Sequence, residues 1–188
     1  MDMADGTTRV TRRTAARIVS HKEVAPLRHL FDAVGPHLAT LAATRFPGYD
    51  RALLTRNPEN YGLYFVHAHA RVPFLWLGVA WADEDPPGTL PSWGASLEVD
   101  GAEVRQLADN VGGLLAACQA VDAREQGTRV HRFPKHLELA AWRKFDWLLE
   151  EEDQPAAVTA FWKEYLDTLV AGGLPAAVAA FLLATAGT

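Results

Sequence analysis

The sequence predicts an α+β fold, in which N-terminal helices precede a small three-stranded antiparallel sheet and a four-helix C-terminal half follows it. Two observations carry this prediction. Within the segment 63–99, apolar side chains recur at every second position over residues 64–72 and again at Leu97 and Val99, which is the period of a β-strand. On both sides of this segment they recur every three to four positions, which is the period of a helix. The 188-residue chain is 49% hydrophobic, so we expect a single domain over residues 20–188.

Residues 1–19 are rich in arginine and threonine and poor in large apolar side chains. Such a segment buries too little surface to offset its loss of conformational entropy, so we predict a flexible basic arm. Ser20 and Glu23 form a capping box at the start of the first helix. We expect this helix to break or kink at Gly35-Pro36, because proline lacks the N–H that a helix interior needs, and to resume until Phe46.

The most strand-like stretch is YFVHAHARVPFLWLGVAW, residues 64–81. Side chains alternate between the two faces of a strand, so His67, His69 and Arg71 share one face. We expect the opposite face to be the buried one, and it holds Tyr64, Val66, Ala68, Ala70 and Val72. The two histidines should therefore project away from the helical core, with Trp76 or Glu98 as their cross-strand neighbour.

Pro73 cannot donate a hydrogen bond to a neighbouring strand, so it should mark the turn between the first strand and the second. The second strand is predicted over residues 74–81. A polar, proline-rich loop follows, and a third strand is predicted over residues 93–101. Because the connections are short, we expect all three strands to be antiparallel.

The C-terminal half shows helical periodicity. Asp100 and Glu103 form a second capping box, and the helix that they open should end at Gly127. Its apolar side is a narrow seam formed by Val104, Leu107, Val111, Leu114, Cys118 and Val121. Gly112-Gly113 costs this helix roughly 1 kcal/mol per glycine, so we expect a close backbone contact there. Three further helices are predicted: one after Pro134 that carries Leu137, Ala141, Phe145 and Leu148, one over residues 156–171, and a last one after Pro175.

Composition and motifs argue against several classes of protein. The net charge of −5 argues against a protein built wholly to hold nucleic acid. A single cysteine, Cys118, allows neither an internal disulfide nor a cysteine-based zinc site. There is no P-loop, no glycine-rich dinucleotide motif and no G-x-S-x-G. We see no secretory signal, and the most apolar segment, residues 174–186, is shorter than the ~20 residues that cross a bilayer, so we expect a cytoplasmic protein without membrane contact.

We therefore expect a non-catalytic module that binds a ligand or a protein partner, and both a homo-oligomer and a subunit of a larger assembly fit this role. The candidate contact residues combine an arginine on the strand face with tryptophans, which are favoured at interfaces: Arg71, Trp76, Trp142 and Trp162. The apolar C-terminal helix offers apolar side chains on nearly all sides, which also favours a partner. No particular cofactor is indicated.

Two alternatives remain open. Histidines at positions i and i+2 of a strand lie on one side, so His67, His69 and Glu98 predict a two-histidine, one-carboxylate metal site of an enzyme. A nucleic-acid-associated protein is the other alternative, since basic residues suited to phosphate contacts occur in two groups: Arg9, Arg12, Arg13 and Arg17, and Arg129, Arg132 and Lys135.

Overall fold

The computed structural model describes residues 9–21, 24–56, 60–81, 89–99, 108–124, 128–133 and 136–186. Within these residues the helices are α1 (Arg12–His21), α2 (Ala25–Arg45), α4 (Ala108–Asp122), α5 (Phe145–Glu150), α6 (Gln154–Ala171) and α7 (Leu174–Thr185). The strands are β1 (Arg51–Arg56), β2 (Asn60–His67), β3 (Ala70–Ala80), β4 (Ser92–Val99), β5 (Thr128–Phe133) and β6 (His136–Lys144). They form one six-stranded antiparallel sheet with the order β1-β2-β3-β4-β6-β5.

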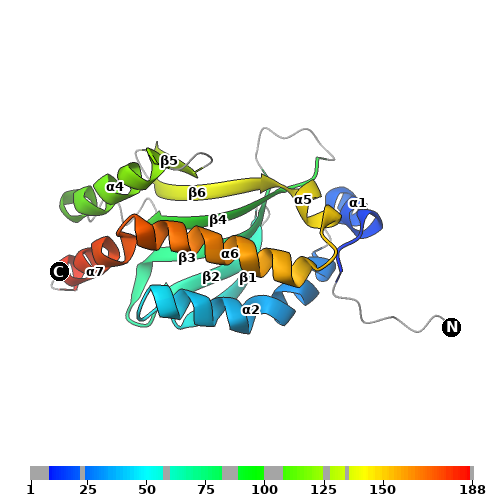
Figure 1. Ribbon diagram of the computed structural model, residues 1–188, viewed down its shortest axis with the longest axis horizontal. Helices are drawn as coiled ribbons and strands as arrows, with labels where there is room; N and C mark the ends of the chain where they lie inside the picture. The colour runs from blue at the N-terminus through cyan, green and yellow to red at the C-terminus, as the bar shows by residue number, and fades with distance from the viewer. Residues whose placement is uncertain are drawn as a thin grey trace.

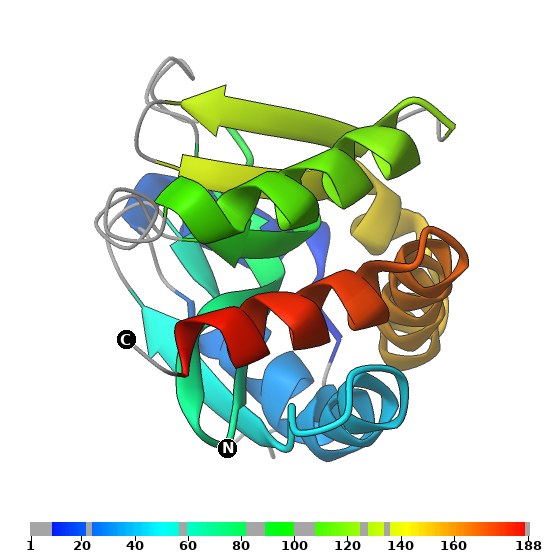
Figure 2. The same ribbon diagram turned by 90° about the vertical axis from the view of Figure 1, so that its left-hand side faces the viewer.

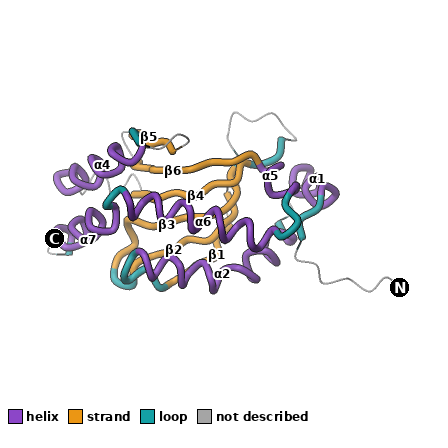
Figure 3. Tube along the Cα trace, in the orientation of Figure 1, coloured by secondary structure: helices purple, strands orange, loops and turns teal. Residues whose placement is uncertain are grey.

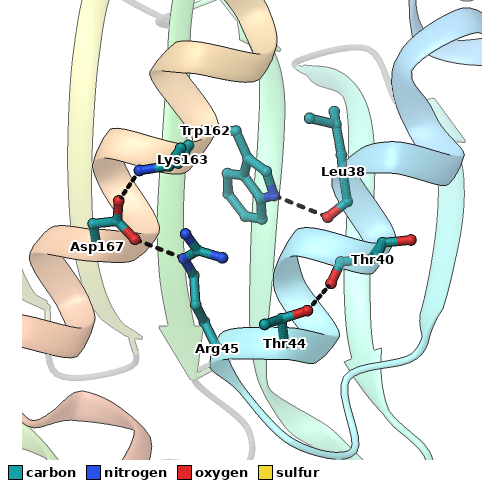
Figure 4. Close-up of polar contacts among 7 residues, drawn as sticks. All are labelled: Leu38, Thr40, Thr44, Arg45, Trp162, Lys163 and Asp167. Atoms are coloured by element: carbon teal, nitrogen blue, oxygen red, sulfur yellow. Dashed lines mark hydrogen bonds and ion pairs between the residues drawn. The ribbon is translucent and has the colours of Figure 1, made fainter.

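Helices α2 and α6 lie side by side across one face of the sheet (Figures 1 and 3). The indole N–H of Trp162 on α6 donates to the carbonyl oxygen of Leu38 on α2, at 3.1 Å (Figure 4). The Trp162 ring also stacks on Phe65 of β2, with ring centroids 4.8 Å apart. One tryptophan therefore joins both helices to the sheet, and the core lies in this layer.

A polar contact reinforces the same helix pair at its surface. Asp167 of α6 accepts a hydrogen bond from Arg45 of α2, at 2.6 Å, and one from Lys163 on its own helix, at 2.5 Å (Figure 4). These hydrogen bonds, that from Arg45 first, lower the pKa of the Asp167 carboxyl. Because Asp167 is 43% exposed, solvent screens this pair and its contribution to stability is small.

Helix α7 crosses one end of the molecule, next to α4, and α1 lies at the opposite end (Figures 1 and 2). Gly173, with φ of 76°, precedes α7, and the axes of α6 and α7 are bent by 71° there. At Gly172 a Cβ atom would collide with Val121 of α4, so the glycine lets the two segments approach. None of the described helices is by itself long and apolar enough to cross a membrane; α6 and α7 meet that requirement only as a bent pair.

The α+β class is confirmed, but the three-stranded sheet and the purely helical C-terminal half are wrong. Residues 136–144, predicted as a helix, form β6, and only Phe145–Glu150 of that region is helical. The sequence HLELAAWRK is rich in good helix formers, yet Leu137 and Leu139 are buried and alternate with Glu138. Pairing with β4 on one side and β5 on the other outweighs the intrinsic helix propensity, which is worth only ~0.7 kcal/mol per residue or less for such side chains.

Two details of the helices also differ from the prediction. Helix α2 runs without a break through Pro36, and its buried side chains continue on both sides of the proline. Gly112 and Gly113 make no close contact with the described part of the chain, since a Cβ at either position would meet nothing there within 4 Å. The seam of α4 is confirmed where the structure describes it, because Val111, Leu114, Cys118 and Val121 are buried; Val104 and Leu107 lie outside the described residues.

The predicted basic arm is described only from residue 9, so its first eight residues lie outside the described part of the chain. From Val10 onward the chain packs on the body. The buried amide of Gln154 on α6 accepts from the Val10 N–H, at 2.6 Å, and donates to the Val10 and Leu148 carbonyl oxygens. Val10 and Ile18 are fully buried. Residues 10–19 are therefore not an arm in this structure, although they contain few apolar side chains.

Candidate functional site

The histidine stretch forms the hairpin between β2 and β3, and its buried face is the opposite of the predicted one. Leu63 and Phe65 point into the helical core and are buried, whereas Tyr64 and Val66 lie on the other face and are half-buried. The alternation was read correctly, but the choice of the buried face was wrong. Phe65 stacks on the Trp162 ring of α6, so packing against a helix far along the chain decides the face.

The turn of the hairpin lies at Ala68-His69, four residues before the predicted position. His67 pairs with Ala70 across this tight turn, and the register shifts between that pair and the pair Phe65–Leu75. Pro73 lies in this irregular stretch, where its lack of an N–H group removes no regular hydrogen bond between strands. Its carbonyl oxygen accepts a hydrogen bond from the Tyr49 hydroxyl at 2.7 Å.

The ring of His67 consequently lies on the helix side of the sheet. It meets the ring of Tyr49 edge to face, with centroids 5.7 Å apart, and the ring of His69 at 5.9 Å. The backbone N–H of His69 donates to His67 Nδ1 at 3.2 Å. Gly48, with φ of 90°, lies directly against His67 Nε2, in a position that a Cβ atom would obstruct. The glycine is therefore required both by the backbone angle and by the imidazole.

A groove of about 680 Å³ lies between this hairpin, the turn after α2 and helix α7. We call it the α7 groove. Its wall is mostly apolar, and it is lined by Phe46, Pro47, Tyr49, His67, His69, Ala70, Pro175, Val178, Ala179, Leu182, Leu183, Thr185 and Ala186. Leu183 is 80% exposed, the highest value among the exposed large hydrophobic residues of the described chain. Exposed apolar surface that borders a concave site is typical of binding sites.

A second hollow, of about 530 Å³, lies around the same hairpin and toward the edge strand β1. Its lining includes Leu53, Tyr64, Val66 and Arg71, together with the two histidines. Arg71 is exposed, as predicted for a contact residue. The tip of the hairpin thus separates two hollows, of which the α7 groove is the larger and the more apolar.

The structure does not assemble the predicted metal site. Glu98 lies on the face of the sheet opposite the helices, where it pairs with Phe74 of β3 and Glu138 of β6. His67 lies on the other face, at the end of β2 where the hairpin to β3 begins. Among the residues that the structure describes, no three histidine, cysteine or acidic side chains come together as a metal-binding group.

Glu98 belongs instead to a polar chain on that opposite face. The Ser96 hydroxyl donates to Glu98 Oε1, and His136 Nε2 lies 3.3 Å from Glu98 Oε2 and 3.9 Å from Glu138 Oε2. Burial, and then the charge of Glu98, raise the pKa of Glu138 to about 7, against a smaller lowering by His136. In a nucleophilic triad the histidine contacts the serine hydroxyl and takes its proton. Here Glu98 lies between Ser96 and His136, so His136 is not placed to take the Ser96 proton.

The three tryptophans predicted as contact residues have different places. Trp162 is fully buried in the core. Trp76 is 3% exposed and lies flat on the face opposite the helices, over Gly62 and Gly78. Trp142 is half-buried over Gly94, and its ring centroid is 5.9 Å from that of Trp76. Glycines on three adjacent strands thus make room for two indoles on the same face.

The two groups of basic residues lie apart. Arg9, Arg12, Arg13 and Arg17 are exposed at α1, at one end of the molecule. Arg129 and Arg132 belong to β5, near the other end (Figure 1), and Lys135 lies outside the described residues. The two groups therefore do not form one continuous basic surface.

Sequence reasoning missed most of the groove. The turn FPGY (residues 46–49) was noted only as the end of a helix, and α7 only as an apolar surface for a partner. No short-range pattern shows that residues 46–49, 67–70 and 175–186 meet, because the contacts join segments far apart in the chain. No family model, curated protein or solved structure matches the chain. The class is thus defined by fold and site alone: a one-sheet α+β protein with helices on one face and an apolar groove at one end.

Proposed function

We propose that this protein is a non-catalytic binding module and that the α7 groove is its binding site. The single observation that carries the proposal is the groove itself, which is large, mostly apolar and built from three separate segments. A volume of about 680 Å³ falls within the range of about 300–1,000 Å³ that is typical of small-molecule sites. The ligand would be held by burial of apolar surface, which is the largest favourable term in such sites.

The reactive side chains support binding rather than catalysis. Cys118 is buried on the seam of α4, and burial raises the pKa of its thiol to about 12, which keeps it protonated and unreactive. The Ser96 hydroxyl is engaged by Glu98 and lies on the other face of the sheet from the groove. Neither residue lines the α7 groove.

The test uses an apolar fluorescent probe such as anilinonaphthalene sulfonate. Ala179 lines the groove, so Ala179→Trp should fill it and weaken probe binding at least tenfold. Ala180, the next residue of α7, is exposed but does not line the groove, so Ala180→Trp is the matched control and should leave binding unchanged. Equal probe affinity in the two variants, both with wild-type thermal midpoints, would refute the proposal.

A second candidate function is contact with nucleic acid through α1, favoured by the exposed arginines on that helix. Phosphate contacts release counterions, so binding should weaken steeply as salt rises. Arg13→Ala combined with Arg17→Ala should reduce the slope of log K against log salt by about 2, at roughly 1 for each lost phosphate contact. Binding that does not change between 50 and 200 mM salt would rule this function out.

A further inference from the structure

The polar side chains of the α7 groove differ in what they can still offer a ligand. The Tyr49 hydroxyl donates to the Pro73 carbonyl oxygen, and the Thr185 hydroxyl donates to the carbonyl oxygen of Phe181 at 3.0 Å. Both hydroxyl protons are therefore used within the fold. Among the residues that the structure describes, no aspartate, glutamate, lysine or arginine lines the groove. The two imidazoles, His67 and His69, are left to contact the polar part of a ligand.

The tautomer of His67 follows from its hydrogen bond. Because His67 Nδ1 accepts the backbone N–H of His69, the neutral ring carries its proton on Nε2. Nε2 lies against Gly48, where a Cβ atom would obstruct it. Because His67 also lines the α7 groove, its neutral ring brings an N–H donor to the groove wall. Arg71 of the same hairpin is exposed nearby and lines the neighbouring hollow together with both histidines.

From this arrangement we propose that the α7 groove binds an aliphatic carboxylate. The alkyl chain would lie along Phe46, Pro47 and the α7 side chains Val178 and Leu182, and the carboxylate would accept hydrogen bonds from His67 and His69. A carboxylate only accepts hydrogen bonds, so it complements the imidazole N–H donors of a groove whose described lining contains no competing anion. This inference rests on the proposed function and adds the chemical class of the ligand.

The chain and the head group make separate predictions. Each methylene buried against the apolar wall should raise affinity about three- to fourfold, so decanoate should bind more tightly than octanoate by roughly tenfold. The head group should discriminate by charge, since the described lining of the groove contains no carboxylate to pair with a cation of the same chain length. We therefore compare decanoate, decanol and decyltrimethylammonium by calorimetry with the full-length protein.

Wild type should bind decanoate at least tenfold more tightly than decyltrimethylammonium. The double variant His67→Ala, His69→Ala should lose this preference and still bind decanol. His69→Ala alone, which keeps the backbone N–H and leaves the His67 ring in place, should lose part of it, and it serves as the milder variant if the double variant is unstable. His37→Ala, at an exposed histidine of α2 outside the groove, is the matched control and should keep the full preference.

The outcomes separate the two proposals. If the three amphiphiles bind equally, or if the double variant keeps the preference for decanoate, the head-group inference is overturned while the groove remains a binding site. If no amphiphile binds but the apolar probe still does, the inference also fails. If the protein is a dimer that Ala179→Trp dissociates and decanoate does not bind, the groove holds a second copy of the chain and the inference is overturned. If neither probe nor amphiphile binds, the proposed function fails as well.

Discussion

Glu138 shows how a single residue on the sheet face opposite the helices links stability to pH. Its carboxyl is directly across from Glu98 on the neighbouring strand, and two carboxylates in such positions repel each other. Burial adds to this effect, so the folded state favours the protonated form and the pKa rises from 4.5 to about 7. His136 lies beside both carboxylates and only partly compensates.

The sign of the pH effect follows from proton binding. Between pH 4.5 and 7 the folded state holds a proton that the unfolded state has lost, so the contribution of Glu138 to stability is most favourable below pH 4.5 and falls as pH rises to 7. The full shift corresponds to at most roughly 3–4 kcal/mol, at ~1.4 kcal/mol per pH unit. Glu138→Gln removes this loss, so its stability relative to wild type should be greater at pH 8 than at pH 5.

Urea denaturation of both proteins at the two pH values measures this difference. Glu150→Gln, at an exposed glutamate on α5, is the control and should run parallel to wild type. A constant difference between Glu138→Gln and wild type from pH 5 to pH 8 would contradict the prediction.

At the scale of single elements, α1 depends on one buried amide of α6. Gln154 is 1% exposed, and its side chain makes three hydrogen bonds to backbone groups of Val10 and Leu148. Removing it leaves buried backbone groups without partners, which costs roughly 1–3 kcal/mol for each such group. The same amide thus positions the start of α1 and the end of α5.

We expect Gln154→Ala to lower the free energy of unfolding by roughly 2–4 kcal/mol.

Deleting residues 1–19 removes buried Val10 and Ile18 as well, each worth about 1.5–3 kcal/mol, so the thermal midpoint should fall by at least about 5 °C. Deleting residues 1–8 alone should leave it nearly unchanged, because that segment contains little apolar surface. Calorimetry of Gln154→Ala and of the two deletion variants measures these changes. Equal thermal midpoints for the two deletions would show that residues 9–19 do not stabilise the fold and that the arm extends over residues 1–19 as predicted.

The whole molecule is organised by its one sheet. Strands from both halves of the sequence pair in it, since β6 of the C-terminal half lies between β4 and β5 and pairs with both. Helices α2 and α6, which are distant in sequence, are joined through Trp162 and Leu38. Neither the sheet nor the helix pair α2 and α6 can keep a buried core without the other, because each buries the apolar face of the other.

Unfolding should consequently be one cooperative transition. Far-ultraviolet circular dichroism reports the helices, and tryptophan fluorescence reports indoles on both faces of the sheet, including Trp76, Trp93 and Trp162. The two signals should give the same midpoint in urea within error. Two separated transitions would show that the predicted single domain over residues 20–188 consists of two units.

The sequence by itself determined the features that depend on local chemistry. Helical periodicity located α2, α6 and α7, and apolar alternation located the strands around His67 and Trp76, because a helix or strand with one apolar face must bury that face somewhere. It also predicted the seam of α4 at Leu114 and Cys118. These features require only the spacing of side chains along the chain.

Only the tertiary structure decided which face of β2 is buried, that residues 136–144 form a strand, and that residues 46–49 and α7 meet at His67. Leu137 and Leu139 fit a helix as readily as a strand until β4 and β5 offer them backbone partners. The face of β2 was decided by Trp162, which stacks on Phe65 from a helix about a hundred residues later in the chain. Contacts of this kind depend on the energy of packing between distant segments, and the order of side chains within any one segment does not contain that information.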